Sequence, residues 1–221
     1  MITHYLKNHC FYCSFRSVKE YMRNEKLLAR AHIPSKYTFN HSHITCDLPR
    51  TIFQTDFTHI HIDKRPFYIF KMIDIFNREV LCFEISTFCG SIVSEKLLVE
   101  LSDMCFNSPF KVISDNGSCY IANSYKQLAK QINATLEFTK AYTPEHNGVV
   151  ERSFRTDKYE GLGNNYLTPD NLKEIYSEWI TFYNTERPHS FNNYEAPIQT
   201  LKKFQTKNPE TKFKGLGYEI L

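Results

Sequence analysis

Long apolar runs are missing from this sequence. No apolar stretch reaches the roughly 18 residues that a helix needs to cross a bilayer. Residues 1–17 carry His, Lys, Asn and Cys where a secretory signal would have its apolar centre. Internal repeats and low-complexity tracts are missing as well. We therefore expect a soluble cytoplasmic protein with no membrane partner.

The cysteines lack the number and spacing of a disulfide framework. The chain has seven, an odd count with no framework spacing, so reduced thiols are expected rather than disulfides. A zinc site at Cys10 and Cys13 is not favoured. A His/His/Cys/Cys site needs two ligand pairs separated by a long helical insert, whereas His9 directly precedes Cys10. Pairing of these cysteines with a ligand between residues 41 and 46 stays open.

A strong net charge is also absent, but the charge is unevenly placed. The formal net charge is +3. Residues 1–50 contain eight Lys and Arg against three acids, residues 200–221 contain five against two, and residues 51–199 contain fourteen against nineteen. Basic ends around an acidic middle suit a protein that holds a polyanion at its edges and gathers carboxylates in between. Solvated basic tails would give the same distribution, so charge alone leaves both interpretations open.

A helical N-terminal segment is expected over residues 1–33. Residues 16–31 have apolar side chains at helical spacing, and Ser17 and Glu20 are placed as a capping box. Residues 34–50 combine Pro, Ser and Asn without a hydrophobic period, which predicts a linker and a domain boundary.

The core domain is expected over residues 51–200, and residues 201–221 are expected to form a basic tail. Three runs rich in Ile, Phe, Tyr and Val begin at Thr51 and are separated by short turn sequences, which predicts three consecutive antiparallel strands. The following segments predict, in order, a helix over 91–105, a strand ending near Asp115, a helix over 124–132, a strand from Thr135, a helix from about Val149 and a long helix to about residue 189. This order predicts an α/β fold with one mixed five-stranded sheet and helices on both faces.

Three acids lie where carboxylates are unusual. Asp56 lies inside the first expected strand, Asp115 closes the fourth, and Glu151 opens a helix. Taken singly, Asp115 could be turn chemistry and Glu151 could favour a helix N-terminus. If the first and fourth strands are neighbours, however, all three acids can meet at one end of the sheet. Three hard oxygen ligands suit Mg²⁺ or Mn²⁺, and two such ions can hold the attacking and leaving oxygens of a phosphodiester displacement.

The motifs around these acids carry a family resemblance. QTDFT, VISDNGSCY and YTPEHNGVVERSFRTDK occur in this order, with 35 residues between Asp115 and Glu151, and WITFYNTERPHSFNNYEAPIQTL follows. Over about residues 50–201 the sequence resembles the catalytic core of the retroviral integrase and bacterial insertion-sequence transposase superfamily. The resemblance implies an RNase H-like fold in which Asp56, Asp115 and Glu151 are catalytic and hold two Mg²⁺ or Mn²⁺ ions.

The resemblance also implies an activity and partners. A DDE-type transposase or integrase nicks DNA at an element end with water, and the freed 3′-hydroxyl then attacks a target strand without a covalent enzyme intermediate. DNA is the implied partner, with self-association to bridge two DNA ends and a nucleoid-associated place in a bacterial cell. Two alternatives stay open: an RNase H-like nuclease that does not join strands, and a catalytically silent DNA-binding protein derived from a mobile element.

Residues near the acids are expected to bind DNA. On one helix Glu151, Arg155 and Lys158 fall at i, i+4 and i+7, which is one face, so the two cations would hold phosphates beside the scissile bond. An i,i+4 ion pair on a solvated face is the alternative. The other expected DNA contacts are Asn116, Asn147, Gly148, Arg152 and Arg187. For Arg187, capping of the preceding long helix is the competing interpretation.

The PEHNG loop is expected to be the mobile element beside the site. Asn147 and Gly148 permit backbone conformations that are closed to bulkier residues, so the loop could approach DNA closely. Gly148→Ala is therefore expected to slow strand transfer more than it weakens DNA binding.

The helix expected over residues 16–31 resembles the last helix of the helix-turn-helix that precedes the core in insertion-sequence transposases. Too little chain precedes it for the complete motif. A partial helix-turn-helix and a helix that serves packing only are both open.

Overall fold

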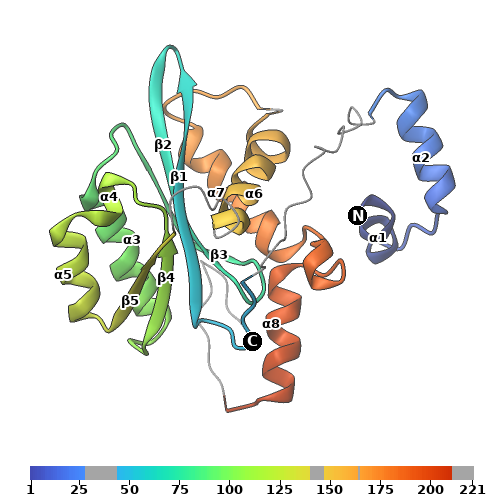
Figure 1. Ribbon diagram of the computed structural model, residues 1–221. Coiled ribbons are helices and arrows are strands. Elements are labelled where there is room, and N and C mark those ends of the chain that lie inside the picture. Colours follow the sequence, from blue (N-terminus) through green and yellow to red (C-terminus); the bar gives the residue numbers. More distant parts are fainter. Residues whose placement is uncertain (28–43, 140–146, 164, 211–221) are drawn as a thin grey trace, which may run out of the picture.

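The computed structural model describes residues 1–27, 44–139, 147–163 and 165–210. Three consecutive strands open the core, strands and helices follow in mixed order, and two short helices precede the core (Figure 1). Within the described ranges no helix is both long enough and apolar enough to cross a membrane.

A five-stranded sheet in the order β3-β2-β1-β4-β5 forms the centre of the molecule (Figure 1). The strands are β1 (Ile52–Ile62), β2 (Arg65–Asp74), β3 (Val80–Ser86), β4 (Phe110–Ser114) and β5 (Ala134–Phe138). The first three are antiparallel neighbours, whereas β4 runs parallel to both β1 and β5. The expected β-meander and the expected mixed sheet are confirmed.

Helices cover both faces of the sheet (Figure 1). On one face lie α3 (Ser91–Met104), α4 (Ser118–Ile121) and α5 (Asn123–Gln131). On the other lie α6 (Gly148–Thr156), a π-helical segment (Asp157–Leu162) and α7 (Leu172–Thr185). The two layers flank the sheet that positions the candidate site.

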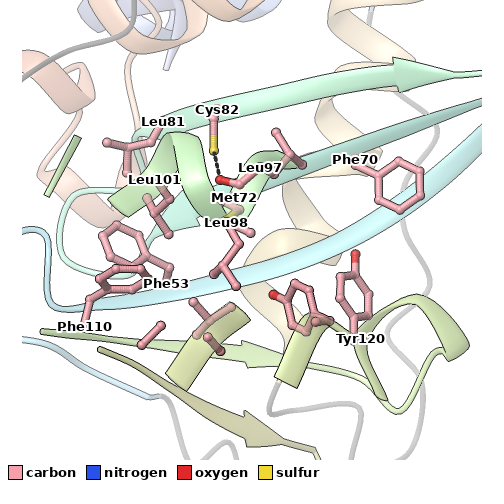
Figure 2. Packing of buried hydrophobic residues seen from close by; sticks show 14 of the residues in the cluster. Phe53, Phe70, Met72, Leu81, Cys82, Leu97, Leu98, Leu101, Phe110 and Tyr120 are labelled. Carbon is pink, nitrogen blue, oxygen red and sulfur yellow. Dashed lines mark hydrogen bonds between the residues drawn. The ribbon is translucent and has the colours of Figure 1, made fainter. Parts of the chain in front are cut away.

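Alternation along β2 explains why the sheet has two apolar faces. Phe70 and Met72 are fully buried in the cluster that contains α3, while Ile69 and Ile73 belong to the cluster that contains α6 and α7. Successive side chains of a strand point to opposite faces, so one strand supplies both cores. Figure 2 shows the first cluster, where the Cys82 thiol donates to the Leu97 carbonyl at 3.6 Å.

The N-terminal segment contains α1 (Ile2–Asn8) and α2 (Phe15–Asn24). The expected helix therefore begins earlier, and the expected capping box is wrong. Ser14 is the N-cap and accepts a hydrogen bond from the Ser17 N–H at 3.0 Å, which places Ser17 inside the first turn. No residue of α2 is buried, and the helix lies away from the sheet (Figure 1). Residues 28–33 of the expected segment lie outside the described residues.

The end of the expected linker belongs to the core instead. The Arg50 side chain lies 2.9 Å from Glu79 and 3.5 Å from Asp74, and its backbone N–H donates to Asp74 at 2.8 Å. Arg50 is 6% exposed, so these ion pairs are buried. Burial raises the pKa of the Asp74 carboxyl to about 6 although Arg50 lowers it. Residues 34–43 of the linker lie outside the described residues.

The C-terminal part of the core also differs from the expectation. The long helix ends at Thr185, three residues before Pro188, because a proline disfavours helical conformation in the preceding residue. A 3₁₀ turn over Ser190–Asn192 follows, and α8 (Pro197–Lys207) then crosses the expected boundary between core and tail. Leu201 is fully buried, so no break falls between residues 200 and 201.

Candidate active site

The two aspartates reach the same edge of the sheet because their strands are parallel neighbours. Gln54 of β1 lies opposite Ile113 of β4. Asp56 and Asp115 each follow two residues later, so both extend past the paired part of the two strands. The topology thus brings together two carboxylates that are far apart in the chain.

Each aspartate has one oxygen engaged by the backbone. Asp56 Oδ1 accepts from the Phe57 N–H at 2.8 Å, and Asp115 Oδ1 accepts from the Gly117 N–H at 2.9 Å. The Asp115 contact is the turn chemistry that the following Asn-Gly suggests. In both residues the second oxygen has no hydrogen-bond partner among the described residues, so it can accept a ligand.

Glu151 is held beside these aspartates by a contact that the sequence did not indicate. Gln54 Oε1 accepts from the Val149 and Val150 N–H groups, both at 3.1 Å. These are amides of the first turn of α6, which lack partners inside the helix. Gln54 and Asp56 are two residues apart on one strand and so share a face. The strand that carries Asp56 therefore also fixes the start of the helix that carries Glu151.

The three carboxylates repel one another. The pKa of Asp56 is raised to about 7, mainly by burial and in part by Asp115 and Glu151, while the Phe57 N–H and Lys71 oppose the shift. Burial also raises the pKa of Glu151, again with a contribution from Asp115. These mutual effects put the three acids in one electrostatic cluster, and a bound cation would favour their ionised forms.

The donor set fits a hard divalent cation. Carboxylate oxygens suit Mg²⁺ and Mn²⁺, and the cluster offers no soft ligand. The described residues contain no group of three His, Cys, Asp or Glu side chains close enough to hold one metal ion. Glu151 is exposed, whereas Asp56 is partly buried.

Lys158 lies beyond the end of the α-helix that carries Glu151 and Arg155, so the expected α-helical i+7 relation does not hold. α6 ends at Thr156, and the chain continues as a π-helical segment with more residues per turn. Arg155 and Glu151 line one cleft, and Lys158 is not part of its wall. A contact between Lys158 and DNA stays a prediction, but the shared helix face no longer supports it.

A buried network that the sequence did not indicate anchors the end of α6. Asp157 is 1% exposed and pairs with Lys71 Nζ. It also accepts from Tyr176 Oη at 2.8 Å and from Trp179 Nε1 at 2.9 Å. Three donors satisfy one buried carboxylate, as burial of a charge requires. The helix of Glu151 is thus tied to β1 at its start and, through Lys71, to β2 at its end.

Two of the expected DNA contacts have structural partners. Asn116 Nδ2 donates to the Thr139 carbonyl at 2.7 Å, which links the ends of β4 and β5. Arg187 donates to both oxygens of Glu160 at 2.7 and 2.8 Å, a bidentate pair that binds the residues after α7 to the π-helical segment. Contacts of either residue with DNA stay predictions.

Gly148 does not need the backbone freedom of glycine. It is the first residue of α6, and a Cβ added there would meet nothing within 4 Å. Its φ lies outside the left-handed region. The stated reason for the Gly148→Ala prediction is therefore wrong. Asn147 is 3% exposed, and residues 140–146 of the loop lie outside the described residues.

The sheet order and the carboxylates at its edge define an α/β protein of RNase H-like architecture with an acidic site. Two family models, both described as integrase core domain, match residues 47–144 and 132–197. The chain belongs to this integrase core family.

Curated relatives are transposases of insertion sequences. The transposase for insertion sequence element IS904 of Lactococcus lactis subsp. lactis (strain IL1403) is 23% identical over 152 residues, which cover 67% of this chain and 60% of the relative. The putative transposase InsD for insertion element IS2E of Escherichia coli (strain K12) is 29% identical over 143 residues, or 59% of this chain and 63% of the relative. The chain thus spans about 60% of the length of these relatives.

Solved structures confirm the RNase H-like fold class. A chain of the simian T-cell lymphotropic virus intasome, in complex with PP2A regulatory subunit B56 gamma, gives a TM-score of 0.64 at 18% identity and covers 89% of this chain and 73% of that one. The HTLV-2 integrase catalytic core domain in complex with magnesium (dimeric form) gives 0.56 at 18% identity, over 70% of this chain and 97% of that one.

Proposed function

We propose that this chain is the catalytic core of a DDE-type transposase that nicks DNA and transfers the cut strand by in-line phosphoryl transfer. The observation that carries the proposal is the electrostatic cluster of Asp56, Asp115 and Glu151 at one edge of the sheet. A partly buried aspartate whose pKa is raised by burial and by two further carboxylates is typical of a functional site.

The three acids have distinct parts in this proposal. Asp56 and Asp115 offer the carboxylate oxygens that their backbone contacts leave open, and Glu151 adds a ligand from the first turn of α6. When bound, Mg²⁺ or Mn²⁺, as two ions, supplies Lewis-acid activation of water and of a 3′-hydroxyl. The exposed side chains of Arg152 and Arg155 hold DNA phosphates beside these ligands.

DNA and a second copy of the chain are the proposed partners. The names of the relatives support the first, since they are transposases of insertion sequences. The solved neighbours include an integrase core in a dimeric form and a chain of an intasome, which supports self-association. A cytoplasmic, nucleoid-associated place in a bacterial cell belongs to the same proposal.

Nicking of supercoiled plasmid tests the proposal, with wild type, Asp115→Asn and the control Asp103→Asn compared in Mn²⁺ and in EDTA. Wild type and the control, which changes an exposed acid of α3, are expected to nick only with metal. Asp115→Asn is expected to fall to the EDTA level while binding DNA as wild type does. Nicking by Asp115→Asn would contradict the site assignment.

A pre-nicked DNA end separates strand transfer from simple hydrolysis. DNA that flanks the coding sequence supplies candidate ends, and the joined product is measured on a denaturing gel. Joining by wild type and its loss in Asp115→Asn are expected. Hydrolysis without a joined product would instead identify an RNase H-like nuclease.

A further inference from the structure

A cleft of about 950 Å³ lies on the α6 side of the sheet. Its wall includes Glu151, Arg152 and Arg155 of α6 at one place and Phe191 and Tyr194 at another. The cleft therefore connects the candidate catalytic glutamate with an aromatic region that follows α7. Nothing in the proposed chemistry uses that aromatic region.

The charge of the cleft is positive. Arginines 78, 152, 155 and 187 line it, and Glu151 is the only acid among its lining residues in the described part of the chain. Arg187 is neutralised by Glu160, but Arg78, Arg152 and Arg155 form no ion pair within the described ranges. The pKa of Arg78 is lowered to about 10, mainly by burial and in part by Arg152, while Tyr183 and Asp74 oppose the shift. Uncompensated cations along a cleft attract a polyanion.

The aromatic region has the form of a stacking platform. The guanidinium carbon of Arg78 lies 3.7 Å from the centroid of the Phe191 ring. Phe191 nevertheless remains 50% exposed. A ring that is supported on one side by a cation and open elsewhere can stack an additional flat π-system.

An unpaired base fits this platform better than a base pair. In a duplex the faces of the bases are covered by their neighbours in the stack, so Phe191 could not reach one. In a single strand the faces are accessible, and single-strand binders combine a cationic groove with aromatic side chains. Phosphates near Arg152 and Arg155 and a base on Phe191 would use both halves of the cleft.

We propose that the cleft binds single-stranded DNA that leads to or from the scissile bond. Phe191 stacks one unpaired base, with Arg78 supporting the ring, and Arg152 and Arg155 neutralise phosphates of the same strand. The place of this strand relative to the scissile bond rests on the proposed function, whereas the binding itself requires no catalysis. The protein would thus stabilise unpaired DNA next to the reacting phosphate.

Fluorescence anisotropy in EDTA tests the cleft, because no strand is cut without metal. The probes are a labelled oligothymidylate of about 20 nucleotides and a labelled duplex of the same length. Phe191→Ala is expected to weaken single-strand binding by about 5- to 150-fold, the range for loss of one stacked base, and to change duplex binding less than about 2-fold. Phe191→Trp is expected to restore single-strand binding.

Two controls keep the outcome specific. Tyr166 is 87% exposed and does not line the cleft, so Tyr166→Ala is expected to bind both probes as wild type does. Phe191→Leu keeps an apolar contact for Arg78 but has no ring. If its Tm equals that of wild type, a loss of single-strand binding in this variant is not caused by misfolding. Equal single-strand affinity of wild type, Phe191→Ala and Phe191→Leu would overturn the proposal, as would an equal loss for both probes.

Replacing both Arg152 and Arg155 by glutamine tests the phosphate contacts. Single-strand affinity is expected to fall and the slope of log affinity against log salt to flatten by about 1.4. An unchanged slope would remove these arginines from the site. The outcome is separable from the proposed function: absence of metal-dependent nicking by wild type would refute the enzyme, whereas unaltered single-strand binding would refute the cleft.

Discussion

Replacing Asp56 by asparagine is expected to stabilise the metal-free protein at alkaline pH. Burial, together with Asp115 and Glu151, raises the Asp56 pKa from 3.8 to about 7. Because the folded state holds this proton more tightly, the stability that protonation contributes is fully present below about pH 3.8. That contribution is lost as the pH rises through 7.

The magnitude follows from the size of the pKa shift. At about 1.4 kcal/mol per pKa unit, ionisation of Asp56 lowers the free energy of unfolding by about 4 kcal/mol at pH 8 and by about 2 kcal/mol at pH 5. Asparagine has nearly the same shape, its amide oxygen can still accept the Phe57 N–H, and it does not titrate. The difference between Asp56→Asn and wild type should therefore grow by about 2–3 kcal/mol from pH 5 to pH 8, or roughly 5–10 °C in Tm for a chain of this size.

The assay is thermal and urea unfolding of wild type and Asp56→Asn in EDTA, at steps between pH 5 and pH 8. The difference in the free energy of unfolding between the two proteins removes the contributions of groups that titrate alike in both. Asp103→Asn, which removes an exposed carboxylate, is the matched control and should show a nearly constant difference. At pH 8, added Mn²⁺ should stabilise wild type and have less effect on Asp56→Asn, because a ligand that binds only the folded state raises its stability.

Two results would refute this reasoning. A stability difference that stays flat from pH 5 to pH 8 would mean that burial and the neighbouring carboxylates do not raise the pKa of Asp56. Lower stability of Asp56→Asn at pH 8 would mean that the charged form is favoured in the fold, as in an ordinary ion pair.

Other changes test the support of the site and the packing beneath it. Gln54→Ala removes the acceptor for two amides at the start of α6. It is therefore expected to lower the free energy of unfolding in urea by about 1–3 kcal/mol and to lower plasmid nicking. Gln54→Glu keeps an acceptor and should lose less stability and less nicking activity. Gly161→Ala is expected to cost about 1–3 kcal/mol, since its Cβ would lie 2.4 Å from the Trp179 ring. Gly148→Ala, with open space around its Cβ, should unfold within about 0.5 kcal/mol of wild type. Equal unfolding midpoints for the two glycine variants would contradict the packing argument.

The sheet could be predicted from the sequence because its signals are local. Runs of β-branched and aromatic residues mark β1 to β3, and period and turn residues mark the later elements. The meeting of Asp56 and Asp115 needed one further condition, that their strands are neighbours, and the parallel pairing of β1 with β4 meets it. The order and spacing of the motifs then predicted the family to which the chain belongs.

Contacts between distant residues could not be predicted in the same way. Gln54 contacts residues 95 and 96 positions later, and Lys71 contacts Asp157 across 86 positions. In a helix pattern Asp157 looks like one more exposed acid among basic neighbours. Its burial accompanies the π-helical segment and the hydrogen bond from Trp179, a residue 22 positions later, neither of which a local pattern indicates.

The ion pair between Lys71 and Asp157 also constrains how this protein can change over generations. Removal of either partner alone leaves a buried charge without its counterion, which typically costs about 3–5 kcal/mol, whereas replacement of both by apolar residues is often tolerated. Positions 71 and 157 should therefore vary together among descendants of this gene.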